Sequence, residues 1–161
     1  MSTLRNTGTF LDSSVIVNLI VETELTKLAE NVIEHRPLLT SETVIDESIY
    51  VIIRKLFALH GIRNRFDVKE KITTPEGKEI IREAIELVMN LLEDKGVGVL
   101  RDADIYLTMA TMEKYGLLPH DAKILATMFQ NGIRRLATFD RDFRNVSGIV
   151  LLPENYWRRK E

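Results

Sequence analysis

The stretch LATFDRDF, from Leu136 to Phe143, decides the fold class of this chain. Together with Arg135 its first half is an apolar run that predicts a short strand ending at Phe139. Asp140 follows that strand at once, and Asp142 stands two residues further on. In an open parallel sheet, ligands bind beyond the carboxyl ends of the strands. The stretch therefore predicts an α/β fold with acidic side chains at the edge of its sheet.

Short strands alternate with helices along the rest of the chain. The apolar runs predict four more strands, at Thr9–Leu11, Leu38–Thr40, Gly96–Leu100 and Ile149–Leu152. Helical spacing of apolar residues predicts helices from Ser13 to Ile20, Glu24 to His35, Ser41 to His60, Lys78 to Asp94, Asp102 to Tyr115 and Pro119 to Asn131. Ser41 or Thr43 is expected to cap the third helix, and Ile62 to Gly77 fits a loop, a short helix or both. The alternation predicts one domain over residues 1–161, a mainly parallel sheet with helices on both faces.

Composition limits the chemistry that this chain can perform. The 161 residues carry 22 Lys and Arg against 24 Asp and Glu, a formal net charge of −2, which argues against a protein that coats duplex nucleic acid. The chain has no cysteine, which excludes thiolate metal sites. It has only three histidines, which makes a histidine-rich metal site improbable. Carboxylate-bound Mg²⁺ or Mn²⁺ remains available. The sequence shows no apolar segment typical of a signal peptide or membrane span, and we expect a cytoplasmic protein.

Four carboxylates occupy equivalent places at strand ends and helix starts. Asp12 follows the first strand and Asp140 the fourth, while Glu47 and Asp121 lie in the first turns of helices. They are expected to converge at one sheet edge, where their mutual repulsion favours a divalent cation between them. Such an ion activates water at a phosphodiester, and a second ion about 3.5–4 Å away would stabilise the leaving oxygen. We expect products with a 5′-phosphate and a 3′-hydroxyl, because water attacks.

Four segments together resemble the motifs of the PIN-domain ribonuclease family. These segments are FLDSSVI (Phe10–Ile16), SETVIDE (Ser41–Glu47), LPHDAKILAT (Leu118–Thr127), and LATFDRDF (Leu136–Phe143) with VSGI and Pro153 behind it. The resemblance covers nearly the whole chain and is weakest from Ile62 to Gly98. It implies a three-layer α/β/α, Rossmann-like domain with about five strands in the order 3-2-1-4-5. It also implies an Mg²⁺- or Mn²⁺-dependent endoribonuclease.

The resemblance assigns roles to particular residues and partners. It implies metal ligands at Asp12, Glu47, Asp121 and Asp140, with Asp142 as an auxiliary ligand or a loop cap. Ser14 and Thr138 match positions that hydrogen-bond near the site. Many small members are VapC-type toxins inhibited by a VapB antitoxin, and many are homodimers, so RNA, a second copy and a small antitoxin are the expected partners. The segment from Arg63 to Pro75 is longer than in a minimal toxin, which leaves an RNA-processing role open.

Several assignments have competing interpretations. Arg141 and Arg144 lie beside the expected site, and they either bind RNA phosphates or belong to a solvated loop. Asp102 and Asp104 are expected to be structural, at the start of a helix. A haloacid-dehalogenase-like phosphatase would need a second Asp where Ser14 stands, and a receiver domain would need a phosphorylated Asp that cannot be placed here. A PIN fold kept as an RNA-binding scaffold would be expected to lack part of the acidic set, which is complete in this sequence.

Overall fold

Five parallel strands form the sheet of the computed structural model, which describes residues 8–158. The strands are β1 (Thr9–Leu11), β2 (Leu38–Ser41), β3 (Gly98–Leu100), β4 (Arg135–Ala137) and β5 (Val150–Leu152). Their order across the sheet is β3-β2-β1-β4-β5, and β1 at the centre pairs in parallel with both β2 and β4. The predicted fold class and strand order are confirmed.

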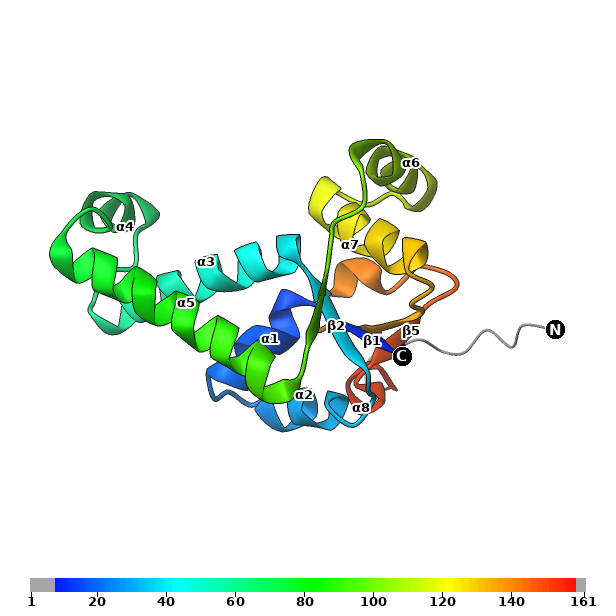
Figure 1. Cartoon of the computed structure of the whole chain (residues 1–161), viewed down its shortest axis with the longest axis horizontal. Helices are drawn as coiled ribbons and strands as arrows, with labels where there is room; N and C mark the ends of the chain where they lie inside the picture. Colours follow the sequence, from blue (N-terminus) through cyan, green and yellow to red (C-terminus); the bar gives the residue numbers. More distant parts are fainter. Residues whose placement is uncertain (1–7, 159–161) are drawn as a thin grey trace.

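Helices cover the two faces of this sheet. They are α1 (Ser13–Ile20), α2 (Thr26–Val32), α3 (Glu42–Leu59), α4 (Arg65–Lys71), α5 (Pro75–Lys95), α6 (Ile105–Tyr115), α7 (Pro119–Gln130), the 3₁₀ helix η1 (Arg141–Phe143) and α8 (Glu154–Arg158). Figure 1 shows α1, α3 and α5 on one side of the strands and α6 and α7 on the other. Within residues 8–158, no helix has both the length and the apolar character that crossing a membrane requires.

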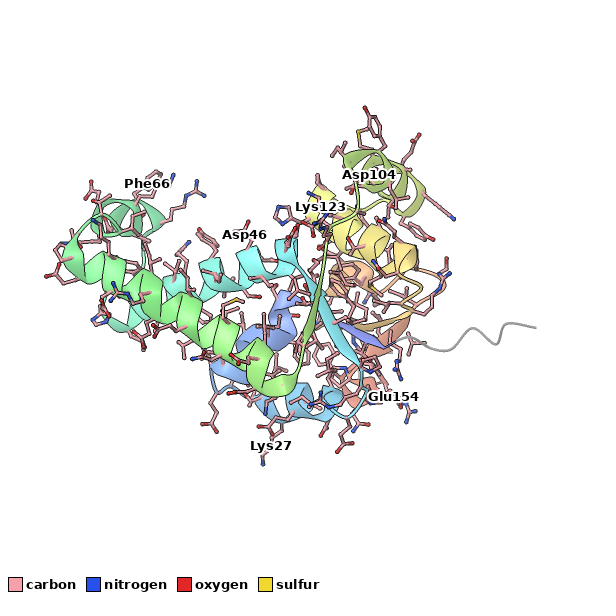
Figure 2. The ribbon with its side chains drawn as sticks, viewed as in Figure 1. Lys27, Asp46, Phe66, Asp104, Lys123 and Glu154 are labelled. Carbon is pink, nitrogen blue, oxygen red and sulfur yellow. The ribbon has the colours of Figure 1, made fainter. Side chains whose placement is uncertain are left out.

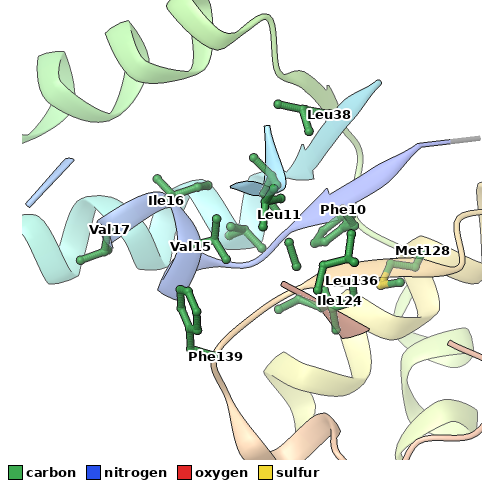
Figure 3. Packing of buried hydrophobic residues seen from close by; sticks show 14 of the residues in the cluster. Phe10, Leu11, Val15, Ile16, Val17, Leu38, Ile124, Met128, Leu136 and Phe139 are labelled. Atoms are coloured by element: carbon green, nitrogen blue, oxygen red, sulfur yellow. The ribbon is translucent and has the colours of Figure 1, made fainter. Parts of the chain in front are cut away.

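The hydrophobic core lies on both faces of β1 and β4. Phe10 and Leu136 are fully buried, and Figure 3 shows them against Ile124 and Met128 of α7, while Ile16 of α1 lies on the other side. Each side chain of this size, when fully buried, stabilises the fold by about 1.5–3 kcal/mol. The core therefore fixes the central strands, whose carboxyl ends carry the acidic residues.

A helical arm extends from the sheet and carries a small core of its own. In Figure 1 the far ends of α3 and α5 project away from the strands, and α4 lies beside them. Phe57, Val68 and Ile80 form this second apolar cluster. Residues 62–77, which the sequence left open, are a loop, then α4, then the start of α5. Asn64 caps α4 by accepting from the Phe66 N–H, and Thr74 caps α5 by accepting from the Gly77 N–H.

Several predicted boundaries differ by a few residues from those in the structure. Gly96 adopts a left-handed φ of 65° as the C-cap of α5, so β3 begins only at Gly98. Asp104 caps α6 by accepting from the Leu107 N–H, and this helix therefore begins at Ile105 and not at Asp102. β4 ends at Ala137, two residues before the predicted strand end at Phe139, so Asp140 lies three residues beyond the strand and does not follow it at once.

Candidate metal centre

Asp12 is the most buried of the candidate acids. It follows β1, its N–H donates to the Ala137 carbonyl oxygen of β4 at 3.0 Å, and only 4% of its surface is exposed. One carboxylate oxygen, Oδ1, accepts from the Ser13 N–H at 2.8 Å, which makes Asp12 the N-cap of α1. The turn from strand to helix thus fixes this carboxylate at the carboxyl end of the sheet.

Two hydroxyl groups hold the other oxygen of Asp12. The Thr138 hydroxyl donates to Oδ2 at 2.6 Å and itself accepts from the Asp140 N–H at 2.9 Å. The Ser14 hydroxyl lies 3.2 Å from the same oxygen and accepts from the Phe139 N–H at 3.0 Å. Through these bonds β1, α1 and the end of β4 form one network. Ser14 and Thr138, the two hydroxyl residues singled out in the sequence, both contact Asp12.

Three further carboxylates converge beside this network. Asp121 in the first turn of α7, Asp140 after β4 and Asp142 in η1 each offer an oxygen, and these oxygens lie within 4.8 Å of one another. Asp140 also caps η1, because its Oδ1 accepts from the Asp142 N–H at 2.9 Å. This bond from the Asp142 backbone orients the Asp140 carboxylate.

The electrostatics of the five acids show that they act on one another. Burial, followed in order of size by the charges of Asp140, Asp12, Asp142 and Glu47, raises the pKa of Asp121 from 3.8 to about 7. The pKa of Asp12 is raised to about 6, because burial, with a smaller contribution from the charge of Glu47, outweighs the lowering effect of the hydrogen bond from Thr138. Glu47, partly buried on α3, is thus close enough for its charge to be felt at both sites. The folded chain holds these carboxylates together at an electrostatic cost.

A cation of the Mg²⁺ type fits this set of donors. Octahedral Mg²⁺ binds oxygens at about 2.1 Å, which places neighbouring ligand oxygens about 3 Å apart and opposite ones about 4 Å apart. The oxygens of Asp121, Asp140 and Asp142, all within 4.8 Å of one another, need only a small adjustment to share one ion. A divalent charge would also offset the repulsion that raises the pKa of Asp121.

The start of α3, which carries Glu47, is held by a bond that the sequence did not predict. Asp102, from the connection between β3 and α6, accepts from the N–H and the hydroxyl of Thr43 at 3.2 and 2.7 Å. Ser41 occupies the N-cap position without a side-chain cap bond, and its buried hydroxyl has no partner among residues 8–158. The expected cap by Ser41 or Thr43 is therefore wrong. Asp102 is structural, but it holds the start of α3 rather than heading α6 as the sequence had suggested.

The residues near the end of β4 differ in how they face the site. Arg141 and Arg144 are both exposed, and Arg144 lines a separate pocket of about 360 Å³ with Trp157 of α8.

The Trp157 indole N–H donates to the Thr138 carbonyl oxygen at 3.1 Å, and the Tyr156 hydroxyl donates to the Phe139 carbonyl oxygen at 3.1 Å. The α8 helix therefore anchors the connection that leads to Asp140. The sequence signal for this helix was Pro153 followed by Glu154, which was too short to interpret as a helix.

Comparisons with known proteins agree with this geometry. The model of the PIN domain family matches residues 9–149. Ribonuclease VapC6 of Methanocaldococcus jannaschii is 32% identical over 157 residues, which cover 90% of this chain and 96% of that protein.

Solved structures show the same fold at low sequence identity. Mycobacterium tuberculosis VapC20, a Sarcin-Ricin loop cleaving toxin, superposes with a TM-score of 0.58 at 18% identity, over 88% of this chain and 96% of that one. A chain of a toxin-antitoxin complex from Klebsiella pneumoniae gives a TM-score of 0.55 at 17% identity, over 88% and 95% of the two chains. With its four motifs in order and the family model matching most of its length, the chain belongs to the PIN domain family.

Proposed function

We propose that this protein is a metal-dependent endoribonuclease whose centre is built by Asp12, Glu47, Asp121 and Asp140, with Asp142 as an auxiliary ligand. One observation carries the proposal: Asp121 lies among four other carboxylates, and their charges and its burial raise its pKa to about 7. Carboxylates whose pKa is raised by burial and by neighbouring charges are typical of functional sites. The family membership and the relative named as a ribonuclease support the same conclusion.

The side chains divide the work of binding. Asp121 and Asp140 offer oxygens from two different elements, and Asp12 offers its remaining lone pairs from a position fixed by Ser14 and Thr138. Mg²⁺ or Mn²⁺, when bound, lowers the pKa of a bound water and neutralises charge on the scissile phosphate. Ser14 and Thr138 keep the Asp12 carboxylate oriented, which is the usual role of hydrogen bonds behind a metal ligand. Arg141, exposed and next to Asp140, is suited to contact a neighbouring phosphate.

The decisive experiment is cleavage of mixed single-stranded RNA with Mg²⁺ or Mn²⁺, with EDTA, and with the variants Asp12→Asn and Asp121→Asn. We expect metal-dependent cutting that both variants lose, and products with 5′-phosphate ends. Asp46→Asn is the matched control, because Asp46 is an exposed acid adjacent to Glu47 in sequence. Intact RNA after treatment with folded wild-type protein would favour an RNA-binding module, and 2′,3′-cyclic phosphate ends would exclude attack by water.

We further propose that the protein is the toxin of a toxin–antitoxin pair and forms a homodimer. The toxin role is supported by its similarity to a VapC ribonuclease and its fold likeness to a chain of a toxin-antitoxin complex, whereas the homodimer is expected from the family resemblance alone. Expression of the wild type in a bacterial host should then arrest growth, whereas Asp12→Asn should not. Light scattering should give a mass near twice 18.5 kDa. Normal growth despite soluble, metal-dependent nuclease activity would favour an RNA-processing role.

A further inference from the structure

The helical arm exposes two aromatic rings, each paired with an arginine. Tyr50 on α3 is 53% exposed and Phe66 on α4 is 66% exposed. The Arg54 guanidinium carbon lies 6.0 Å from the centre of the Tyr50 ring, and that of Arg65 lies 5.7 Å from the Phe66 ring. Figure 2 shows Phe66 at the outer surface of α4. Rings of this kind, exposed beside cations, are typical of surfaces that stack unpaired bases.

Hydrogen bonds from Arg54 connect the Tyr50 side chain to the segment before α4. Arg54 donates to the Tyr50 hydroxyl at 3.1 Å and to the Arg63 carbonyl oxygen at 3.2 Å. The side chains of α3 are therefore tied to the segment that leads into α4. The five residues Tyr50, Arg54, Arg63, Arg65 and Phe66 are called the arm platform below.

The arm platform lies in a basic part of an acidic chain. Between positions 54 and 71 the chain carries six Lys or Arg residues and two acids, whereas its formal net charge is −2. Cations concentrated in this way attract phosphates, which a uniformly mixed surface of this net charge would not do. This local excess of cations supports contact between the arm platform and phosphates.

The arm platform and the proposed metal centre both include residues of α3. On α3, Tyr50 comes three residues after Glu47 and Arg54 comes seven residues after it, so the three side chains share one face of the helix. At 1.5 Å per residue, Arg54 lies about 10 Å along the helix axis from Glu47. A strand held at the carboxylates and lying along α3 would meet Tyr50 first and then the arginines.

We propose that the arm platform binds a single-stranded segment of RNA next to the bond cut at the carboxylate cluster, a proposal that rests on the ribonuclease function above. Tyr50 and Phe66 stack on bases, and the three arginines contact phosphates. Stacking needs unpaired bases, so a duplex of the same sequence binds less tightly. The platform supplies affinity without reading a sequence, because every base presents a flat face to an aromatic ring.

Fluorescence anisotropy of a labelled single strand of about 12 nucleotides, measured in EDTA, tests this surface without cleavage. Tyr50→Ala and Phe66→Ala should each weaken binding about tenfold, while Tyr50→Phe keeps the ring and most of the affinity. Arg54→Gln and Arg65→Gln should each lower the slope of log K against log salt by about 0.7. The matched control is Tyr106→Ala on α6, whose ring is 77% exposed, and its binding should equal that of the wild type.

Three results would overturn the proposal: arm variants that bind like the wild type, a Tyr106→Ala variant that loses as much affinity, or a duplex that binds more tightly than the single strand. Urea unfolding of each variant checks that it is folded. The two proposals also fail separately. If the wild type does not cut RNA but arm variants still weaken binding in EDTA, the nuclease assignment fails and the platform stands. If the wild type cuts RNA and arm variants leave binding unchanged, the platform fails alone.

Discussion

Neutralising Asp121 should stabilise the metal-free protein while abolishing its response to metal. Asp121 has a pKa of about 7 against an ordinary value of 3.8, and each pKa unit corresponds to about 1.36 kcal/mol. Its ionisation in the folded chain therefore costs about 4 kcal/mol before screening by solvent. Because the side chain is partly exposed, we expect about 1–2 kcal/mol of this in an unfolding experiment. Asp121→Asn removes the charge and keeps the shape, so it should recover that amount at pH 8.

Urea unfolding in EDTA at pH 8 measures the difference in unfolding free energy between Asp121→Asn and the wild type. Because the pKa of Asp121 is raised in the folded state, its contribution to the unfolding free energy is full below pH 3.8 and is lost as the pH rises through about 7. The difference in unfolding free energy between Asp121→Asn and the wild type should therefore narrow towards pH 4. Excess Mn²⁺ should make the wild type more stable than Asp121→Asn, since only the wild type keeps the complete carboxylate set. Asp46→Asn, an exposed control on α3, should change stability by less than about 0.5 kcal/mol. An Asp121→Asn variant no more stable than the wild type at pH 8 would refute the reasoning.

Three other predictions follow from the same contacts. Thr138→Val removes the hydroxyl that donates to Asp12 and accepts from Asp140, so calorimetric titration should show Mn²⁺ affinity reduced about 10–100-fold; unchanged affinity would mean that the network does not support the ion. Asp12→Asn in EDTA should flatten the fall in unfolding free energy between pH 3.8 and about 6, and a curve parallel to that of the wild type would contradict the raised pKa of Asp12. Leu136→Ala, at a fully buried position of β4, should lower the unfolding free energy by about 2–5 kcal/mol in urea denaturation; a smaller loss would show that the core refills the space.

The sequence predicted the convergence of the acids because strand ends and helix starts obey a simple rule. Once strands are assigned before Asp12 and Asp140, and helix starts before Glu47 and Asp121, a parallel sheet brings all four to one edge. The fold class follows from the alternation of strands and helices, the strand order was implied by the family resemblance, and both are confirmed. Which acids serve as ligands stays a prediction, because charge proximity does not by itself show a bound ion.

The arm and the cap of α3 depend on contacts that no local pattern contains. The α4 helix is seven residues long and is held by Val68 against Phe57 and Ile80, which come from two other helices. Asp102 reaches Thr43 across 59 positions of sequence, so a rule based on the residue before a helix selects Ser41 instead. Short elements and distant partners are set by tertiary packing, and the sequence leaves them open for that reason.

Trp157 gives this protein an optical reporter of its own. It is the only tryptophan in the chain, and its indole N–H is bonded to the carbonyl oxygens of Thr138 and Leu152 at the end of the sheet. Any shift of the segment from Thr138 to Asp140 changes the surroundings of that single fluorophore. We therefore expect metal binding at the carboxylate cluster to change the Trp157 emission of the unlabelled protein, with no dye and no second tryptophan to subtract.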